Sequence, residues 1–434
     1  MHKKLMRQRQ HWVILRFPNH QILRRPPLSH PDLISIAGGW EGYHVAKSTT
    51  LCVGNQKRVE VELVPLHRLH MLCPACGGQC KGVHETIKRT VRDLPILDAQ
   101  TFLIVHRRRF LCPQCGPILE NLPWLGKYSR VTKRLAESVA RLCGVLAIKH
   151  VAELFGLSWG QVKDIDKRSL EQRFGTVDLS GVEVIGMDEF ALQKGHRYAT
   201  VIVEPYRKEV LFVAKGRGRE SIRPFFEKLG PDGCSRLKAV VMDMNGAFEE
   251  EVKAKAPNAS IVYDLFHVVA KYSREVICRV RNAEIQRLKD DQQSRKVVQG
   301  SRWLLLRNYS NLKPDDKLRL EELLDANHNL MTVYLLNDYL KELWSLRSIN
   351  QAEQCWQQWY QLATESKIPH LVLFARRLQG YLQGILNHCK WPLHTGLLEG
   401  INNKIKVIKR MAYGFRDHDY FFLKIRAAFP GIPR

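Results

Sequence analysis

Two C-x-x-C pairs place the strongest constraint on how this chain can fold. Cys73 and Cys76 form the first pair, Cys112 and Cys115 form the second, and a glycine follows each pair. A C-x-x-C on a tight turn directs two thiolates toward one metal ion, and two such turns joined by a hairpin complete a tetrahedral zinc site. The interval 77–111 is longer than the usual spacing of roughly 15–20 residues. It nevertheless contains "RTVRDLPILDAQTFLIVHRRRF", which has the composition of a strand, a turn and a second strand. We therefore predict a structural zinc ribbon.

Two neighbouring residues offer a rival ligand set for this zinc ion. Cys80 and His84 follow Cys76 closely, so either could join the site. The four-cysteine set is favoured over that alternative, and a metal-free arrangement is the least favoured of the three. The second strand of the hairpin also carries a run of cations suited to DNA phosphates, namely Arg107, Arg108 and Arg109.

A helix-turn-helix pattern follows in "IKHVAELFGLSWGQVKDIDKRSLEQRF". Ala152 is small enough for two helices to cross, Gly156 stands at the turn, and Val162 anchors the second helix. Ser158 is placed to cap that second helix. Many packed helical hairpins share this pattern, but the adjacent ribbon and the charge of the chain favour DNA binding. The side chains predicted to face DNA are Gln161, Lys163 and Lys167.

The charge balance indicates a polyanionic partner. Lys and Arg number 68 against 43 Asp and Glu, a formal net charge of +25, which in a globular chain points to nucleic acid. Nowhere do eighteen apolar residues run together, so no membrane span is expected. The basic N-terminus has an apolar run too short for a signal peptide. An odd count of eleven cysteines then favours reduced or metal-bound thiols and a cytoplasmic location.

Three acidic residues suggest a second, catalytic metal site. "VEVIGMDEF" and "LKAVVMDMNG" are predicted to be apolar strands that end in Asp188 and Asp243, and such strand ends place carboxylates at the rim of a sheet. Glu399 lies in "LLEGINNKIKVIKRMAYGF", an amphipathic helix rich in cations. Any one of these acids alone is more simply a solvated group. The residues in line with Glu399 on the helix are Asn403, Lys406 and Arg410.

Three converging carboxylates repel one another unless hard cations such as Mg²⁺ or Mn²⁺ hold them. Two such ions about 3.5–4 Å apart can activate water or a 3′-hydroxyl and stabilise the leaving oxygen of a phosphodiester. The cations around Glu399 would then hold the DNA backbone over the metals. The three acids together therefore predict phosphodiester chemistry.

Four segments resemble one enzyme family. "GMDEF", "VVMDMNGAF", "YDLFHVVAK" and "LLEGINNKIKVIKRMAYGFRDHDYFFLKI" are similar to the transposases of the ISL-three group of bacterial insertion sequences. The resemblance extends from the first C-x-x-C over nearly all the remaining chain. It implies a DDE enzyme with an RNase H-like catalytic domain, in which Asp188, Asp243 and Glu399 are the catalytic acids. "YDLFH" is similar to a D-x-x-H motif of related DDE enzymes, which makes Asp264 and His267 candidate supporting groups. A packed histidine at the start of a helix is the alternative for His267.

The predicted fold class is α/β, with an RNase H-like mixed sheet and an all-helical insertion, preceded by a zinc ribbon and a helix-turn-helix. The expected domains are an N-terminal segment of unclear role (1–65), the zinc ribbon (66–128), the helix-turn-helix (129–178), the first part of the catalytic core (179–267), the helical insertion (268–390) and the C-terminal helical part of the core (391–434).

The expected function is a DNA transposase that binds element ends and catalyses metal-dependent phosphodiester hydrolysis and strand transfer. The expected partners are double-stranded terminal inverted repeats and target DNA, in a bacterial cytoplasm where the bound protein would associate with the nucleoid. The expected cofactors are two Mg²⁺ (or Mn²⁺) ions per active site and a structural Zn²⁺. Two element ends must be paired, so a homodimer or higher oligomer is expected on DNA. The alternatives are a non-catalytic, transposase-derived DNA-binding regulator, which would not need all three acids, and an RNase H-like nuclease without strand transfer.

Overall fold

The computed structural model describes residues 38–54, 56–66, 71–193, 195, 197–393 and 396–432. The chain divides into two compact units. The N-terminal unit holds the described residues up to Val145 together with Lys149–Val162, and the C-terminal unit holds Leu146–Ile148 and the described residues from Lys163 onward. Most of the segment of unclear role, 1–37, lies outside the described residues. Among the helices that the structure describes, none combines the length and apolarity that a membrane crossing needs.

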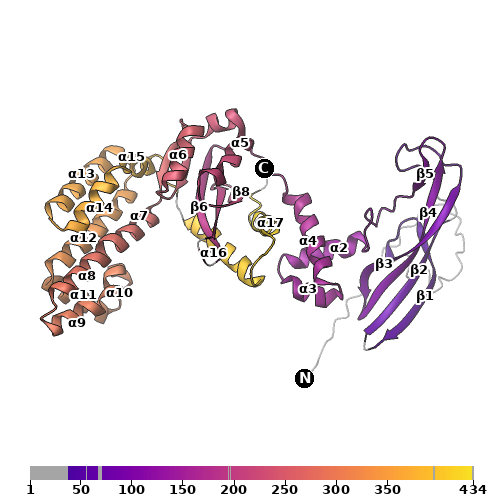
Figure 1. Cartoon of the computed structure of the whole chain (residues 1–434), viewed down its shortest axis with the longest axis horizontal. Helices are drawn as coiled ribbons and strands as arrows, with labels where there is room; N and C mark the ends of the chain where they lie inside the picture. The colour runs from indigo at the N-terminus through magenta and orange to yellow at the C-terminus, as the bar shows by residue number, and fades with distance from the viewer. Residues whose placement is uncertain are drawn as a thin grey trace, which may run out of the picture. The chain divides into compact units, whose positions relative to one another are not determined.

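A five-stranded sheet forms most of the N-terminal unit (Figure 1). A long antiparallel hairpin connects the two C-x-x-C turns, as its alternating sequence predicted. Val61 and Leu63 of the preceding strand are fully buried beside Leu103 of the hairpin, so this strand belongs to the same core. The expected boundary at 65/66 therefore falls inside one sheet, whose order is β1-β2-β4-β3 with β5 on β4. The strands are β1 (Tyr43–Val53), β2 (Gln56–Pro65), β3 (Val83–Ile96), β4 (Ala99–Cys112) and β5 (Gly116–Leu119).

Three helices follow the sheet, α2 (Lys133–Cys143), α3 (Ile148–Phe155) and α4 (Trp159–Phe174). The turn between α3 and α4 contains Gly156 with φ +58°, a left-handed conformation that favours glycine. Ala152 and Val162 are buried, as the helix-turn-helix pattern requires. Helix α4 begins in the N-terminal unit and belongs to the C-terminal unit from Lys163 onward.

A second five-stranded sheet is the centre of the C-terminal unit, with the order β10-β9-β6-β7-β8. Strands β6, β7 and β8 are antiparallel neighbours, whereas β9 and β10 run parallel to β6. Each strand contains β-branched residues, and the two apolar runs identified in the sequence lie in β6 and β9. Their bounds are β6 (Val184–Gln193), β7 (Arg197–Glu204), β8 (Glu209–Lys215), β9 (Ala239–Met242) and β10 (Ser260–Tyr263).

Alternating side chains of this sheet face two different cores, because successive residues of a strand point to opposite faces. Ile185 and Ile202 pack with helices α5 (Arg219–Arg236) and α6 (Gly246–Lys255) on one face. On the other face, the adjacent residues Val184, Val201 and Val203 pack with the last two helices of the chain (yellow in Figure 1). Those helices are α16 (Gly396–Met411) and α17 (His418–Ala428).

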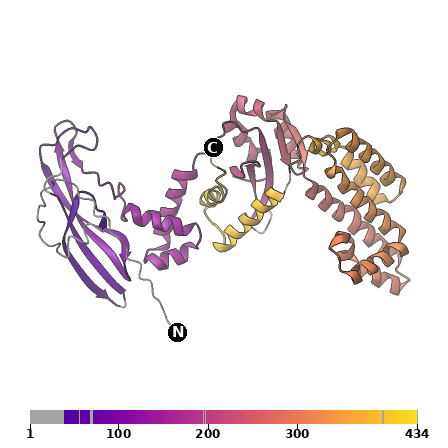
Figure 2. The same cartoon turned by 180° about the vertical axis from the view of Figure 1, so that it is seen from behind.

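A helical insertion separates β10 from α16, as predicted (orange in Figure 1, seen from behind in Figure 2). Its core contains the buried Trp344, Trp356 and Trp359. Its last part returns to β10, where Asn387 Nδ2 donates to the carbonyl oxygen of Ile261 at 2.8 Å. The insertion comprises α7 (Leu265–Tyr272), the π-turn Ser273–Ile277, α8 (Cys278–Arg287), α9 (Gln292–Gly300), α10 (Arg302–Leu306), the 3₁₀ turn Tyr309–Asn311, α11 (Pro314–Ala326), α12 (His328–Glu342), the 3₁₀ turn Leu343–Ser345, α13 (Ile349–Glu365), α14 (Pro369–Gln379), α15 (Leu382–Leu386) and the 3₁₀ turn Asn387–Cys389.

Candidate active site and zinc site

The four predicted zinc ligands converge. The thiol sulfurs of Cys73, Cys76, Cys112 and Cys115 all lie within 4.8 Å of one another. Such spacing fits a tetrahedral site with four Zn–S bonds of about 2.3 Å. His84 is exposed outside this group, and the buried Cys80 packs beneath it without belonging to it. The structure therefore gathers the four-cysteine set rather than the rival set.

Local backbone geometry prepares these thiols for a metal ion. The glycine after each pair has a left-handed conformation, with φ +72° at Gly77 and φ +73° at Gly116, so each turn can close tightly. The backbone N–H of Cys115 lies 3.4 Å from the sulfur of Cys112. Donation from the N–H groups of Cys115 and Gln114 lowers the pKa of the Cys112 thiol to about 6. The thiolate is the form that binds zinc, so the turn favours the ligating state of Cys112, whereas hydrogen bonding to Cys76 and Cys73 raises the pKa of the Cys115 thiol.

The three arginines predicted to contact DNA are occupied within the ribbon domain. Arg107 is buried, and its guanidinium donates to the carbonyl oxygen of Glu120 at 2.7 Å. Arg108 donates to the carboxylate of the same glutamate at 3.0 Å. Arg109 forms an ion pair of 2.7 Å with Glu85 on the paired strand. Arg107 therefore has a packing role that the sequence alone did not indicate.

The polar residues of α4 differ in their surroundings. Gln161 is exposed, and its side chain accepts from the Ser158 N–H at 3.0 Å while its own N–H lies 3.2 Å from the Ser158 hydroxyl. This reciprocal pair is a capping box that starts the helix. Lys163 and Lys167 instead lie 2.9 Å and 3.0 Å from the carboxylate of Asp417, at the start of α17. Two of the three predicted DNA contacts are thus ion-paired within the chain.

Three aspartates occupy the same edge of the second sheet. β6 pairs with β9 through Gly186 and Val241, two residues before Asp188 and Asp243 respectively. β9 pairs with β10 through Met242 and Tyr263, one residue before Asp243 and Asp264. Continuing this register aligns the three aspartates across adjacent parallel strands. We call Asp188, Asp243 and Asp264 the carboxylate rim.

Electrostatic effects show that the rim acids influence one another. Burial raises the pKa of Asp188 to about 6, and the negative charges of Asp243 and Asp264 add to that shift. His267 lies beside them, with Nδ1 3.1 Å from Asp264 Oδ2. That hydrogen bond, together with the charges of Asp243, Asp264 and Asp188, raises the pKa of His267 to about 9. A protonated His267 therefore balances part of the negative charge at the rim.

Helix α16 docks directly against the strand that carries Asp188. A Cβ added to Gly186 would lie 3.3 Å from Leu398 Cδ2, so the glycine allows a close approach. One turn further along α16, Asn402 Nδ2 donates to Asp188 Oδ2 at 2.6 Å. Glu399 is exposed and lies three residues before Asn402, on the same side of the helix. The helix thus carries the third predicted acid within one turn of the residue that contacts the first.

Three further polar residues at this edge, Glu189, Asn245 and Asn402, escaped the sequence analysis as site residues. Glu189 follows Asp188, and its carboxylate accepts from Asn245 Nδ2 at 2.6 Å. Asn245 also caps α6, accepting from the N–H of Ala247 at 3.0 Å. The "DMNG" turn that marked the end of β9 in the sequence was the available signal for Asn245. Asn402 had no signal beyond its spacing from Glu399.

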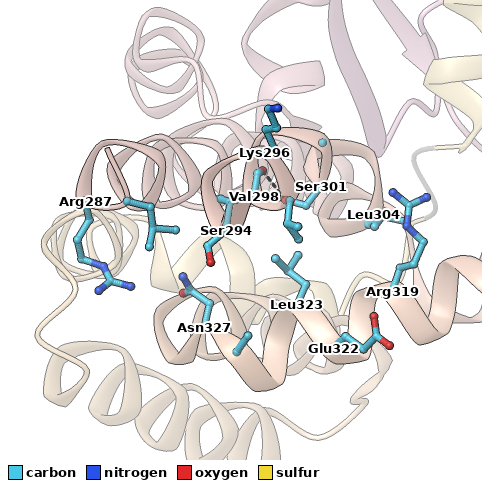
Figure 3. Close-up of a pocket in the computed structure, with 14 residues that line it drawn as sticks. Arg287, Ser294, Lys296, Val298, Ser301, Leu304, Arg319, Glu322, Leu323 and Asn327 are labelled. Atoms are coloured by element: carbon cyan, nitrogen blue, oxygen red, sulfur yellow. Dashed lines mark hydrogen bonds between the residues drawn. The ribbon is translucent and has the colours of Figure 1, made fainter. Parts of the chain in front are cut away.

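A separate cavity of about 390 Å³ opens in the helical insertion, among α9, α10 and α11 (Figure 3). Leu304 and Leu323 line its apolar side, and the side chains of Arg287 and Arg319 lie at its margins. The residues that line it include none of the rim carboxylates. The candidate active site is therefore the sheet edge and not this cavity.

Comparison with known proteins agrees with this architecture. Residues 70–115 match the family model described as the zinc-finger of transposase IS204/IS1001/IS1096/IS1165. Residues 120–170 match the helix-turn-helix domain of transposase family ISL3. Residues 185–425 match an ISL3 family model described as "Transposase".

Full-length relatives carry the same description. The transposase for insertion sequence element IS1001 of Bordetella parapertussis is 51% identical over 403 residues, which cover 93% of this chain and 99% of that protein. The transposase for insertion sequence element IS1557 of Mycobacterium tuberculosis is 25% identical over 385 residues, covering 84% of this chain and 86% of that protein.

The zinc ribbon, the helix-turn-helix and the acidic sheet domain define a DDE transposase, a class of enzymes that cut and join DNA strands with divalent metal ions. The chain belongs to the ISL3 family of transposases. The family resemblance and the function expected from the sequence are thus confirmed, as is DNA binding through a helix-turn-helix.

Proposed function

We propose that this transposase binds the terminal inverted repeats of an insertion sequence and cuts them at a site formed by Asp188, Asp243 and Glu399. These three acids would hold two Mg²⁺ (or Mn²⁺) ions, because carboxylate oxygens suit hard divalent cations. The ions supply the charge that activates water or a 3′-hydroxyl and stabilises the leaving oxygen. The freed 3′-hydroxyl is then joined to target DNA.

The observation that carries this proposal is the contact between α16 and the rim. Asp243 directly follows β9, Asp188 lies within β6 just beyond its parallel pairing with β9, and a 2.6 Å hydrogen bond from Asn402 holds the helix of Glu399 against Asp188. Residues three apart on a helix have Cβ atoms about 5–6 Å apart. Glu399 is therefore within side-chain reach of the same edge.

The strand arrangement supports an RNase H-like core. An antiparallel trio, β6 to β8, is extended on one side by two parallel strands, and helices cover both faces. Under this proposal the core comprises the sheet with α5, α6, α16 and α17, and the insertion runs from α7 to α15. The ribbon domain would include β1 and β2 in addition to the expected 66–128.

His267 would act as a positioning group in this site. Its bond to Asp264 and its protonation place a cation beside Asp188 and Asp243. Such a cation favours the ionised form of Asp188, which is the form that binds a metal ion. Asp264 orients the imidazole and also caps α7, accepting from the Phe266 N–H at 2.8 Å.

Exposed residues of α16 and α4 would contact the DNA. Asn403, Lys406 and Arg410 are exposed on the helix of Glu399, and Gln161 is exposed near the start of α4. Cations next to the acids would hold the phosphate backbone over the ions. Because two ends must be brought together, we expect a homodimer or higher oligomer on DNA, with the DNA-bound protein at the nucleoid.

Cleavage of labelled terminal-repeat DNA tests the proposal. Wild type should cut in the presence of Mg²⁺, whereas Glu399→Gln should bind the same DNA and lose at least about 10³ in rate, because charge stabilisation by the ions is worth several kcal/mol. Glu227→Gln, an exposed glutamate on α5, is the matched control and should cut as wild type does. Equal cutting by Glu399→Gln would remove this residue from the mechanism. DNA binding without any cutting by the wild type would favour a regulator.

A further inference from the structure

Asn402 uses one half of its amide and leaves the other half without a partner. Its Nδ2 donates to Asp188 Oδ2 at 2.6 Å. Its Oδ1 is buried and has no hydrogen-bond partner among the described residues. The assignment of the two amide atoms follows from chemistry, because an ionised carboxylate can only accept, so the nitrogen must face Asp188.

The unpaired oxygen is costly unless something occupies the space beside it. A buried acceptor without a donor costs about 1–3 kcal/mol. Hard divalent ions take amide oxygens or water as neighbours, in addition to carboxylates. An ion held by Asp188 would bring such a neighbour to Asn402 Oδ1. The unpaired Asn402 Oδ1 thus fits a site in which this oxygen gains a hydrogen-bond partner only when the ion is bound.

The fold holds Asn402 in this position from two sides. Leu398, four residues earlier on the same stripe, packs in the close approach that Gly186 permits. Ile401 and Ile405 are each 1% exposed in the core under the helix. The Glu189 N–H donates to Asp188 Oδ1 at 2.7 Å, so both oxygens of Asp188 are oriented by a donor.

We propose that Asn402 is a further residue of the catalytic metal site: its Nδ2 orients the Asp188 carboxylate, and its Oδ1 accepts a hydrogen bond from a water molecule on the divalent ion. This inference rests on the proposed function, because it assigns a role within the same site. It also explains why Glu399 and Asn402 share one helical turn. One turn would supply a metal ligand and the residue that positions another ligand.

Direct measurement of metal binding tests this role without relying on catalysis. Mn²⁺ is titrated into the zinc-loaded full-length protein, and bound Mn²⁺ is followed by electron paramagnetic resonance for wild type, Asn402→Ala and Asn402→Ser. Loss of a group that supports a metal ligand typically weakens metal affinity by about 10- to 100-fold. We expect that loss in Asn402→Ala, with binding of terminal-repeat DNA unchanged. Raising Mn²⁺ should restore much of the cleavage rate of the variant.

Val407→Ala is the matched control, because Val407 is exposed on the same helix away from Asp188. It should bind Mn²⁺ with wild-type affinity. If wild type binds Mn²⁺ and cuts while folded Asn402→Ala has the same Mn²⁺ affinity, the role of Asn402 is wrong and the proposed function stands. If wild type binds no Mn²⁺ beyond the zinc site, the proposed function itself fails. Melting temperatures identify folded variants, and unfolding of both Asn402 variants would make the residue structural and overturn the inference.

Discussion

The zinc site and the proposed catalytic site at the carboxylate rim are assembled in different ways. The cysteines come from two short turns at the ends of one hairpin, and their sulfurs lie within 4.8 Å of one another. The rim acids and Glu399 come from separate strands and a helix, with the whole insertion between β10 and α16. Among the described side chains, the acids do not gather as closely as the cysteines do.

The difference follows from the charge and the surroundings of the ligands. Thiols can be neutral and can pack together, so a ribbon can bring them close before zinc arrives. Carboxylates repel one another, and burial adds to that cost, as the raised pKa of Asp188 shows. The rim instead uses His267 to hold Asp264 and Asn402 to hold Asp188, while Asn245 holds the neighbouring Glu189.

Removal of zinc should have the largest effect, and the effect should be local. Structural zinc contributes on the order of 10 kcal/mol in small domains. In Cys112→Ser we expect loss of the bound zinc and loss of amide protection in the turns around 71–82 and 111–119. The part of the sheet around Val61, Leu63 and Leu103 has its own core and should stay protected. Hydrogen exchange and zinc analysis measure this outcome, with Cys52→Ser, an exposed thiol on β1, as control. If the entire sheet lost its amide protection in Cys112→Ser, the effect of zinc removal would not be local and this prediction would be wrong.

Loss of a rim acid should affect the reaction far more than the fold. Asp243→Asn should slow Mg²⁺-dependent cleavage by about 10³-fold or more, because several kcal/mol of charge stabilisation by the ions are lost. Its melting temperature should not fall, since one repelling charge is removed from the rim. Asp232→Asn, an exposed acid on α5, should leave the rate unchanged. A large fall in melting temperature would indicate that the rim acids stabilise the fold.

A change beneath α16 should displace the site without touching an acid. In Gly186→Ala the added Cβ would lie 3.2 Å from Val203 Cγ2 and 3.3 Å from Leu398 Cδ2, so these side chains must move by a few tenths of an ångström, and we expect the first turn of α16 to move with Leu398. Overpacking costs about 1–3 kcal/mol. A misplacement of about 1 Å can cost about 10² in rate. For Gly186→Ala we therefore expect a lower cleavage rate in a cleavage assay and a lower melting temperature in a thermal melt. Gly300→Ala is the control, because a Cβ added there meets open space, and it should change neither quantity. An unchanged cleavage rate would show that the site does not depend on this contact.

The smallest effect concerns Asp417, which accepts from Lys163 and Lys167. Burial opposes its ionisation, but the hydrogen bonds from Lys163, the Tyr420 N–H and Lys167 hold its pKa well below the ordinary value. Asn still caps a helix, so Asp417→Asn removes mainly the charge, and we expect a loss of about 1–2 kcal/mol. A carboxyl whose pKa is lower in the folded state stabilises the fold at pH values above its unfolded-state pKa, which is about 4 for Asp. This stabilisation is lost progressively as the pH falls below that value. The difference in unfolding free energy from wild type should therefore be full at pH 7 and shrink below pH 4. The exposed Asp419→Asn is the control, and a difference independent of pH would contradict the charge explanation.

The sequence predicted the features that are coded locally. The cysteine spacing indicated the ribbon, Gly156 and Ser158 indicated the turn and its cap, and two apolar runs indicated β6 and β9 of the second sheet. Asp188 and Asp243 were found because each stands at the end of an apolar run, although the strand expected to end at Asp188 continues as β6 to Gln193. Each of these signals spans a few residues, so one chain sufficed to recognise it.

The features that escaped prediction depend on distant pairs. Lys163 was predicted to contact DNA because its ion-pair partner, Asp417, is 254 positions away in the sequence. Arg107 was predicted to contact phosphates because its hydrogen bond to the carbonyl oxygen of Glu120 was not visible in the sequence. The role of Gly186 and Asn402 required the docking of α16 on β6. Likewise, β2 read as a strand, but its parallel pairing with β4 was not visible in the sequence.

The return of the insertion to β10 has a consequence for how evolution can vary this enzyme. Asn387 donates a hydrogen bond to the carbonyl oxygen of Ile261, and the rings of Tyr263 and Tyr381 meet edge to face at 5.4 Å. The end of the insertion therefore packs against β10, the strand from which the insertion starts. A flexible linker of that length would leave the position of Glu399 poorly defined. Closing such a linker would also cost conformational entropy, and this cost increases with linker length. A folded insertion whose two ends are held together by these contacts removes that freedom. Helices can therefore be gained or lost at its far end while the distance from rim to glutamate is preserved.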